Sequence, residues 1–573
     1  MLKKEGFTLI ELLAVIVILA IILAISIPTI TGLIESTTKN AFLMDAKMVI
    51  KAIDYQLMEG YDLEKTPINK ENFETILKLS TKNYEEVIVV SNEKKEPYVK
   101  LVGQNKWAGL TVCGTYKDMK IGSTTEIVCE PPVIAGDEGG WDSNKGVNRP
   151  QLAKGMIPVI WDDNDDLIKK GEAGWNDDLW YDYKNEQRWA NAVSVHDNEI
   201  IAYWVWIPRY VYKITKCHHG IEECMQDNNE ELYGEIKISF TRGTDDVAPD
   251  GELKNTCEYN ADGIPTGENP CANDSNGTWS THPAFTFGYD EDKVELTGFW
   301  VAKFEPSLAG DCTGNNDGKH LDYVCPINIL PGKESWRATR IGAYFSAFRN
   351  MEVDVRYGWE VASELQTSGM FLHDNNDVDT HLMKNVEWGA VAYLATSEYG
   401  KNERIDRNTS YDYYTGGNKA SSYTQEDSYK YNVKQSTTGN VTGIYDMSGG
   451  AYEYTAAYVN NENSSLTTYG EVIVNANKKY KDVYLATNDG RVNNYNESEY
   501  KKGDAIWETT TSSGTTSSWF GEYSYMPYSS GPWFLRGGDW NSSNSGVFYF
   551  NGNSGNAFSS VSGRAVVLVA KGL

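Results

Sequence analysis

Eight cysteines are the side chains of this 573-residue chain with the clearest capacity for covalent chemistry. They form four sequential pairs: Cys113 with Cys129, Cys217 with Cys224, Cys257 with Cys271, and Cys312 with Cys325. Disulfides between neighbours would close four short loops, which is typical of chains that fold in an oxidising, extracytoplasmic compartment. Metal binding by the same thiolates is the alternative, but no C-x-x-C spacing occurs, so the pattern favours disulfides. The spacing leaves the connectivity open.

Other candidates for catalysis or metal binding are weaker. The sequence has no H-E-x-x-H, G-x-S-x-G or G-x-x-x-x-G-K-[ST] motif. His218 and His219 lie between two cysteines, where a solvated loop is the favoured interpretation. The acidic runs 162–166 and 374–379 offer oxygen ligands, but both lack the glycine and terminal glutamate of an EF-hand. We therefore expect solvated turns and no cofactor, with structural calcium as the alternative.

The charge balance restricts the partners. Asp and Glu number 80 against 52 Lys and Arg, a net charge of −28. Such a chain repels phosphate backbones, so we expect no nucleic-acid partner. Apolar residues make up 40% of the chain, enough for packed cores, and the 17 Trp and 37 Tyr also suit rigid contact surfaces.

The N-terminus has the composition of a membrane segment. No polar residue occurs from Leu12 to Ile25, and Glu11 is the nearest charge before that run. About 20 apolar residues suffice to cross a bilayer, and Lys3 and Lys4 would keep the preceding tail in the cytoplasm. No small-residue cleavage site of a secretory signal follows the run. The sequence therefore predicts a single transmembrane helix.

The stretch KKEGFTLIE, from Lys3 to Glu11, strongly resembles the prepilin leader of type IV pilins and pseudopilins. The resemblance implies cleavage by prepilin peptidase after Gly6, N-methylation of Phe7 and packing of the apolar helix against other pilin subunits. A carboxylate within an apolar helix is costly unless it is paired. The amino group of Phe7 on a neighbouring subunit can pair with Glu11. A plain membrane anchor is the alternative, and it leaves Glu11 unexplained.

Hydrophobic periodicity divides the rest of the chain. The chain is expected to begin with a leader (1–6), followed by a transmembrane and filament-core helix (7–58). A small pilin-like sheet (59–132) comes next, with strands near 86–90, 98–102 and 110–113. A turn-rich linker (133–146) follows. Residues 147–573, here called the head, read as many short strands with few helices. Within it, 203–210 predicts a buried strand and 386–394 a helix.

Several blocks of the head resemble the formylglycine-generating, sulfatase-modifying enzyme family. In the family's order they are Gly298–Glu305, the helix at Trp388, Gly439–Tyr454, Phe534–Trp540 and Arg564. The resemblance implies an α+β protein with an elaborated, loop-rich C-type lectin-like domain at 296–573. We interpret 147–295, which carries no recognisable block, as an N-terminal part of the head. Enzymes of that family bind copper through cysteines near the C-terminus. No cysteine follows Cys325, so we expect no such activity and no enzyme.

The C-terminal stretch 539–562 has an unusual composition. Ser and Asn supply 12 of its 24 residues, and aromatic residues and Gly supply most of the rest. Aromatics interleaved with small polar residues are typical of antibody-like contact surfaces. A surface loop built from turn-forming residues is the alternative.

On this fold the pattern resembles the variable region of diversity-generating retroelement target proteins, here 536–564. In such proteins misread adenines scatter Asn codons to residues of this kind. Gly546–Phe548 and Arg564 would be unvaried scaffold, whereas Gly563 departs from the aromatic residue usual there. The ligand-binding residues implied are Asp539, Trp540, Asn541, Ser542, Ser543, Asn544, Ser545, Tyr549, Asn551, Asn553, Ser554, Asn556, Phe558, Ser559 and Ser560.

Together these features predict a type IV pilin-like adhesin or receptor. We expect it in a cell-surface pilus, after a single-pass stage in the inner membrane, with an external protein or glycan as ligand. Two alternatives remain: a structural pilin or pseudopilin without adhesive function, and an enzyme on the same fold with an unrecognised site.

Overall fold

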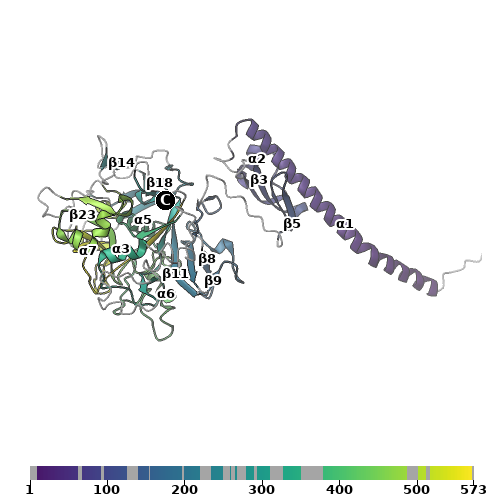
Figure 1. The fold of residues 1–573 in the computed structure, drawn as a ribbon. Helices are drawn as coiled ribbons and strands as arrows, with labels where there is room; N and C mark the ends of the chain where they lie inside the picture. The colour runs from purple at the N-terminus through teal and green to yellow at the C-terminus, as the bar shows by residue number, and fades with distance from the viewer. Residues whose placement is uncertain are drawn as a thin grey trace, which may run out of the picture. The chain divides into compact units, whose positions relative to one another are not determined.

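The computed structural model describes residues 9–61, 63, 68–91, 96–124, 140–153, 155–196, 199–217, 219, 234–249, 258–259, 265–266, 279–289, 293–309, 327–349, 378–486, 501–511 and 516–570. The chain divides into two compact units, residues 1–138 and 139–573, both drawn in Figure 1. Within 9–35, side chains are described only for Leu13 and Val17.

The first unit combines one long helix with a small sheet. Helix α1 (Leu9–Met58) is followed by an antiparallel sheet of order β1-β2-β3-β4-β5. The strands are β1 (Ile68–Asn69), β2 (Tyr84–Ser91), β3 (Pro97–Gly103), β4 (Leu110–Gly114) and β5 (Met119–Ser123), and α2 (Lys70–Leu77) follows β1. Alternation along β3 buries Val99 and Leu101 in one cluster with Phe42 and Ile53 of α1. The three strands expected here are confirmed as β2, β3 and β4.

The N-terminal predictions fall largely outside the described residues. These include Gly6, Phe7 and the side chain of Glu11, so their roles in processing and assembly stay predictions. Within the part of the chain that the structure describes, no helix combines the length and apolar character needed to cross a membrane.

The largest sheet of the second unit has seven antiparallel strands, in the order β22-β28-β19-β11-β10-β8-β9. They are β22 (Val378–Leu382), β28 (Ala565–Val569), β19 (Gly298–Ala302), β11 (Glu199–Pro208), β10 (Asn191–His196), β8 (Met156–Trp161) and β9 (Leu167–Lys169). β11 confirms the buried strand expected at 203–210 as far as Pro208, whereas Tyr210 begins a strand of another sheet. The last strand of the chain, β28, lies beside β19, so the first and last recognisable blocks of the head meet in one sheet.

A second sheet positions the C-terminal stretch. Its order is β24-β23-β25-β26, and β27 adds to β23 in parallel. The strands are β24 (Asp482–Leu485), β23 (Tyr452–Asn460), β25 (Trp533–Gly537), β26 (Gly546–Asn553) and β27 (Val561–Gly563). The predicted variable region therefore runs from the end of β25, through β26, to β27.

Shorter elements complete the second unit. The small sheets are β13 (Glu235–Phe240), β12 (Tyr210–Lys216) and β16 (Ser280–Thr281); β6 (Trp141–Asp142) and β7 (Val147–Asn148); β14 (Glu258–Tyr259) and β15 (Pro265–Thr266); β17 (Thr286–Phe287) and β18 (Val294–Glu295); β20 (Ser307–Leu308) and β21 (Ile327–Asn328). In the described residues of this unit the α-helices are α3 (Ile341–Arg349), α5 (Asn385–Thr396), α6 (Ser428–Tyr431) and α7 (Ser464–Asn475). This described part is thus mixed and strand-rich, with few helices.

Helix α5 lies in the centre of the core and confirms the helix expected at 386–394. Nearly all of its residues are buried, and small or apolar residues lie on every side of the helix, Trp388 and Tyr393 among them. Trp388 donates its indole N–H to the carbonyl of Val547 in β26, at 2.7 Å. This bond ties the C-terminal stretch to the core.

The disulfide prediction is tested for two of the eight cysteines. Cys113 and Cys217 lie in the described residues, and each is disulfide-bonded. The remaining cysteines lie outside the described residues: Cys129, Cys224, Cys257, Cys271, Cys312 and Cys325. The expected pairing of Cys113 with Cys129 and of Cys217 with Cys224 therefore stays a prediction, as do the pairs Cys257 with Cys271 and Cys312 with Cys325.

Candidate ligand-binding surface

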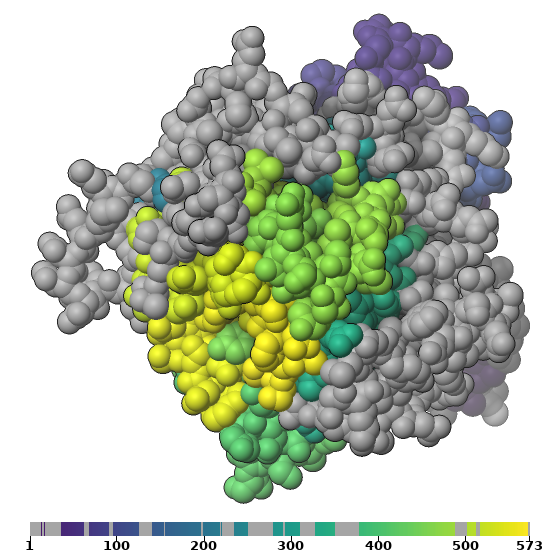
Figure 2. All heavy atoms as spheres, turned by 60° about the vertical axis from the view of Figure 1, so that its left-hand side comes forward, coloured from purple at the N-terminus to yellow at the C-terminus, as the bar shows by residue number. Residues whose placement is uncertain are grey.

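Two loops and one strand carry the predicted contact residues. Loop A (538–545) joins β25 to β26, and loop B (554–560) joins β26 to β27. Figure 2 shows this C-terminal segment, in yellow, exposed on one face of the molecule beside green atoms of earlier segments. The surface therefore combines the predicted region with residues far away in sequence.

Exposure separates the fifteen predicted residues into three groups. Asn541, Ser543, Phe558 and Ser559 are exposed. Asp539, Trp540, Ser542, Asn544, Asn551, Asn553, Ser554, Asn556 and Ser560 are half-buried. Ser545 and Tyr549 are buried, at 0% and 3% exposed. The expectation that these last two contact a ligand directly is therefore corrected: both side chains support the surface from beneath.

Loop A is fixed through its main chain. Three successive carbonyls accept hydrogen bonds from other segments: that of Ser542 from Arg407, that of Ser543 from Arg404 at 2.9 Å and that of Asn544 from the Tyr523 N–H at 3.1 Å. The N–H of Trp540 donates to the carbonyl of Gly450 at 2.8 Å. None of these bonds uses a side chain of the loop itself.

Loop B is fixed in the same way. Three backbone N–H groups donate to its carbonyls: Ile341 to Gly555 (3.1 Å), Ala338 to Phe558 (3.0 Å) and Tyr452 to Ser560 (2.9 Å). Two side chains do the same: the Tyr454 hydroxyl donates to the carbonyl of Asn556 (2.8 Å), and Arg337 donates to that of Ser559. A backbone carbonyl is present whatever residue stands at a position. The course of both loops is thus specified with little dependence on the exposed side chains.

Asp539 closes the first turn of loop A. Its carboxylate accepts the N–H of Ser542 at 2.9 Å, and the Ser545 hydroxyl donates to its carbonyl at 2.8 Å. Burial raises the pKa of the Asp539 carboxyl, although hydrogen bonds from backbone N–H groups and from Tyr452 act in the opposite direction. Gly538 has a φ of +73°, and a Cβ there would collide with Ser545, so the turn requires glycine.

A buried charge centre lies among the framework blocks. The Arg564 guanidinium is fully buried and donates to both carboxylate oxygens of Glu453, at 2.9 and 2.5 Å. It also donates to the carbonyls of Ala302 (2.7 Å) and Tyr445 (3.0 Å). One side chain thus joins the blocks 298–305, 439–454 and 564.

Two further carboxylates face this arginine. Burial raises the pKa of Glu305, and the charges of Asp446 and Glu453 raise it further. Burial alone would lower the pKa of Arg564, but the charge and hydrogen bonds of Glu453 raise it. The centre therefore places three buried carboxyl groups around one shared cation, Arg564. Glu305 also accepts hydrogen bonds from Ser335 and Ala451, and Asp446 from Asn408 and Gly416.

Two candidates for metal binding, Asp162 and His219, have other partners, whereas residues 374–377 of the second acidic run lie outside the described residues. Asp162 accepts the N–H groups of Asn164 and Asp166, both at 2.9 Å, which is an ordinary acidic turn. His219 stacks on Trp507 with ring centroids 3.6 Å apart, whereas His218 lies outside the described residues. In the described ranges no group of three or more His, Cys, Asp or Glu could hold a metal ion.

The arginines that hold the loops were not predicted. Arg337, Arg404 and Arg407 lie more than a hundred residues before the carbonyls they bind, and nothing in their local sequence distinguishes them from surface arginines. The recognisable signal was the composition of the loops, which does not identify the donors.

Comparison with known proteins gives one match at the N-terminus. Residues 1–27 match the prokaryotic N-terminal methylation motif, so the chain carries this motif. The search of curated proteins finds no match.

Among solved structures, Treponema denticola variable protein 1 is 12% identical, with 49% of this chain and 90% of that chain covered and a TM-score of 0.19. The Major Tropism Determinant U1 and M1 variants are each 12% identical, with 86% of this chain and 83% of theirs covered and TM-scores of 0.21 and 0.20. TM-scores this low transfer neither fold nor function.

Proposed function

We propose that the chain is a type IV pilin-like surface subunit whose head binds an external ligand through loops A and B. The observation that carries this proposal is the anchoring of both loops by their carbonyls, with Asn541, Ser543, Phe558 and Ser559 left exposed. The role is recognition or adhesion, without catalysis. The head has a C-type lectin-like fold of the formylglycine-generating-enzyme type, a proposal supported by the blocks that Arg564 joins.

Anchored loops favour binding because they are already ordered. A ligand that contacts a mobile loop must offset the entropy of ordering it, whereas a fixed loop has already lost that freedom. The exposed side chains then supply one aromatic ring and small polar groups that adapt their hydrogen bonds.

The N-terminus would place the head outside the cell. The methylation motif at residues 1–27 supports processing by prepilin peptidase at Gly6 and assembly through the apolar helix, after a single-pass stage in the inner membrane. Glu11 would pair with the Phe7 amino group of a neighbouring subunit. Glu11→Ala is then expected to abolish filaments, scored by electron microscopy, without changing ligand binding by the head.

The binding proposal is tested by removing the exposed side chains together. Asn541, Ser543, Phe558 and Ser559 are replaced by Ala in one variant, and the equally exposed Ser421 and Ser422 in a control. Protein and glycan arrays serve as probes, and filaments are counted in parallel. We expect the first variant to lose the array signals with normal filaments and the control to keep both. Unchanged signals in the first variant would refute a binding role for the loops.

We further propose that residues 536–564 are diversified by a retroelement. The tolerance that the carbonyl contacts give to exposed positions supports this. Deep amplicon sequencing of codons 530–573 with their flanking DNA is the test. Substitutions confined to codons that hold adenine in a nearby template repeat are the expected result. A uniform region without a template would leave a fixed lectin-like adhesin.

A further inference from the structure

We propose that the ligand-contact surface extends beyond loops A and B onto tyrosines of two other segments, and that the whole face takes a folded protein whose contact surface is basic. The inference rests on the proposed function, because it enlarges the same site. The first group of additional residues is Tyr411 and Tyr413, which lie more than a hundred residues before loop A in the sequence. The second group, in the segment that precedes β25, is Tyr523, Tyr525 and Tyr528.

The first pair of tyrosines adjoins the indole of loop A. Tyr411 is 70% exposed, and its ring meets Trp540 edge to face, with centroids 5.1 Å apart. Tyr413 meets Trp540 in the same geometry at 6.5 Å. The Arg337 guanidinium lies 3.8 Å from the centroid of the Tyr413 ring while it holds the carbonyl of Ser559. Tyr411 is therefore continuous with loop A, and Tyr413 with both loops.

The second group continues from the other side. Tyr549, buried under the surface, stacks on Tyr523 at 5.4 Å and contacts Tyr452 at 5.6 Å. The ring of Tyr523 contacts that of Tyr525, with centroids 6.3 Å apart, and the ring of Tyr525 contacts that of Tyr528 at 6.2 Å. Tyr525 and Tyr528 are 36% and 39% exposed, so both rings reach the surface.

One acidic side chain connects the two groups. Asp539 of loop A is next to Trp540 in sequence and so adjoins the first pair of tyrosines. Its carboxylate is also hydrogen-bonded to Tyr452, whose ring contacts Tyr549 of the second group. We call the resulting set the aromatic row: Tyr411, Tyr413, Trp540, Tyr452, Tyr549, Tyr523, Tyr525 and Tyr528. Only Trp540 and Tyr549 belong to the predicted variable region. A diversified surface would thus be flanked by constant aromatic contacts.

The extent and chemistry of the row favour a protein partner. Stable protein interfaces bury about 800 Å² on each side, and their strongest contacts are enriched in Tyr and Trp. A row that crosses loop A and has exposed rings in two other segments, 411–413 and 523–528, offers rigid contacts over a broad face, with small polar groups between them. Tyrosine and tryptophan carry this area with few rotatable bonds, so ordering them costs little.

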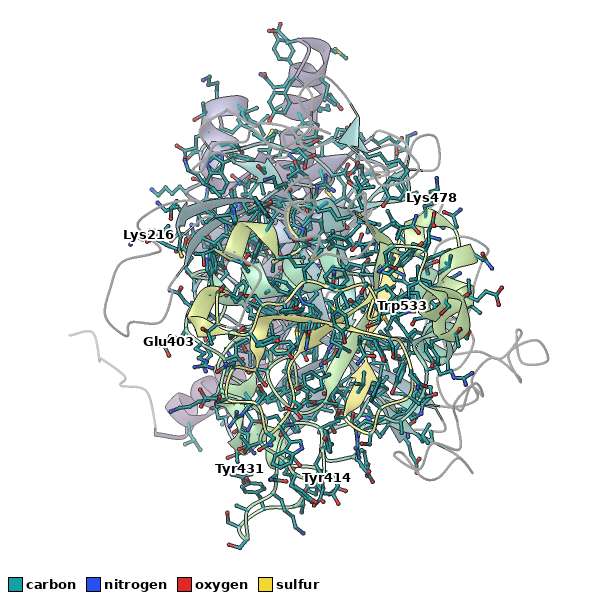
Figure 3. All side chains as sticks on the ribbon, turned by 90° about the vertical axis from the view of Figure 1, so that its left-hand side faces the viewer. Lys216, Glu403, Tyr414, Tyr431, Lys478 and Trp533 are labelled. Atoms are coloured by element: carbon teal, nitrogen blue, oxygen red, sulfur yellow. The ribbon has the colours of Figure 1, made fainter. Side chains whose placement is uncertain are left out.

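The charges near the row favour a basic partner. The Arg337 guanidinium is buried and paired with Glu334 at 2.6 Å, whereas Arg404 and Arg407 are half-buried cations that donate to carbonyls of loop A. Exposed carboxylates remain: Asp412, between the two tyrosines of the first pair, and Glu403, next to Arg404, which Figure 3 shows at the periphery of the head. Aromatic faces also attract Lys and Arg. Together with a net charge of −28, these groups complement a cationic surface.

The test uses the full chain in detergent and a phage library of one small folded scaffold with a randomised face as the probe. Selected binders are measured against Tyr411→Ala, Tyr525→Ala and the control Tyr431→Ala. Tyr431 is 63% exposed but stacks on Tyr423, outside the aromatic row. We expect the randomised faces of the selected binders to be richer in Lys and Arg than those of the unselected library. Tyr411→Ala and Tyr525→Ala should each weaken their binding about tenfold or more, whereas Tyr431→Ala should leave it unchanged. Binding should also weaken at high salt.

The other outcomes separate the two proposals. Binders that depend on Asn541, Ser543, Phe558 and Ser559 but not on the row tyrosines would overturn the extended surface and leave the proposed function standing. Binders indifferent to both sets, or faces without an excess of Lys and Arg, would overturn the inference. A glycan-array signal that requires Tyr411, with no protein binder, would replace the protein partner by a carbohydrate.

Discussion

Loops A and B and the charge centre around Arg564 specify structure in opposite ways. In the loops most contacts to other segments are accepted by main-chain carbonyls, and the side chains that close the turn of loop A, those of Asp539 and Ser545, are not exposed. In the charge centre every contact depends on a particular side chain: one guanidinium holds one carboxylate and two carbonyls in a fully buried place. The head thus keeps tolerant and intolerant positions in separate regions.

This separation explains how a surface can change while its support does not. Substitution at an exposed position leaves a carbonyl contact in place, because the carbonyl belongs to the backbone. Substitution of a buried charged group leaves its partner without a counter-charge in a medium of low polarity. The loss of unfolding free energy expected from a substitution is therefore several-fold larger at Arg564 than at the exposed positions of loop B, although the two are adjacent in sequence.

The largest effect is expected from Arg564→Leu. This change leaves Glu453 buried without its cation and removes the charge that faces Glu305 and Asp446, which should cost about 3–5 kcal/mol of unfolding free energy. Denaturant unfolding followed by tryptophan fluorescence measures it. The double variant Arg564→Leu/Glu453→Leu should recover part of the loss. A loss below about 1 kcal/mol in the single variant would contradict the central role of Arg564.

The next effect concerns His381, a second buried site that depends on side-chain identity. Its ring bonds Asp379 at 2.7 Å and Glu387 at 2.9 Å. Burial alone would lower the pKa of His381, but the charge of Glu387 and both hydrogen bonds raise it above 6.5. The histidinium in turn helps to hold the pKa of Glu387 at about 2, against the effect of burial.

The sign of the pH dependence follows from that shift. A group whose pKa is higher in the folded state than in the unfolded state stabilises the fold fully at pH values below its unfolded-state pKa. That stabilisation is lost as the pH rises through its folded-state pKa. Stability should therefore fall above about pH 6.5. His381→Gln should cost about 2–4 kcal/mol at pH 6 and flatten this part of the profile. An equal slope in the variant, measured by thermal unfolding from about pH 5.5 to 8.5, would assign the dependence to another group.

Much of the scaffold could be predicted from the sequence because local patterns determine it. The continuous apolar run of β11 and the small and aromatic residues of α5 are buried on all sides, so their hydrophobic pattern suffices. The composition of 539–562 identified the loops for the same reason, since turn-forming residues and exposed polar groups are local properties.

The donors to the loops and the depth of single residues could not be predicted. Arg404 reaches the carbonyl of Ser543 only because the folded chain brings two distant segments together. Tyr549 resembles the exposed tyrosines of the surface in its sequence context, yet its ring is buried between those of Tyr523 and Tyr452. Both facts depend on long-range packing, which residue type and spacing do not encode locally.

An intermediate effect is expected from Arg404→Ala, which removes one carbonyl contact of loop A. A partly exposed hydrogen bond of this kind contributes about 1 kcal/mol. Global stability should change by no more than that, whereas amide hydrogen exchange at 542–545 should accelerate. Arg404→Lys should restore part of the protection. Unchanged exchange in the Ala variant would show that the turn closed by Asp539 fixes the loop without the arginine.

The smallest effects are expected at the exposed positions themselves, and they are the most direct way to break the comparison. Asn541→Tyr and Ser543→Asp change size and charge, but both side chains are exposed and the carbonyl of Ser543 stays bound to Arg404. Surface substitutions away from specific contacts stay within about 0.5 kcal/mol. Denaturant unfolding of the single and double variants measures this, with Ser545→Asp, at a fully buried position, as the sensitive control. A loss above about 1 kcal/mol in either single variant would mean that loop A depends on its side chains after all.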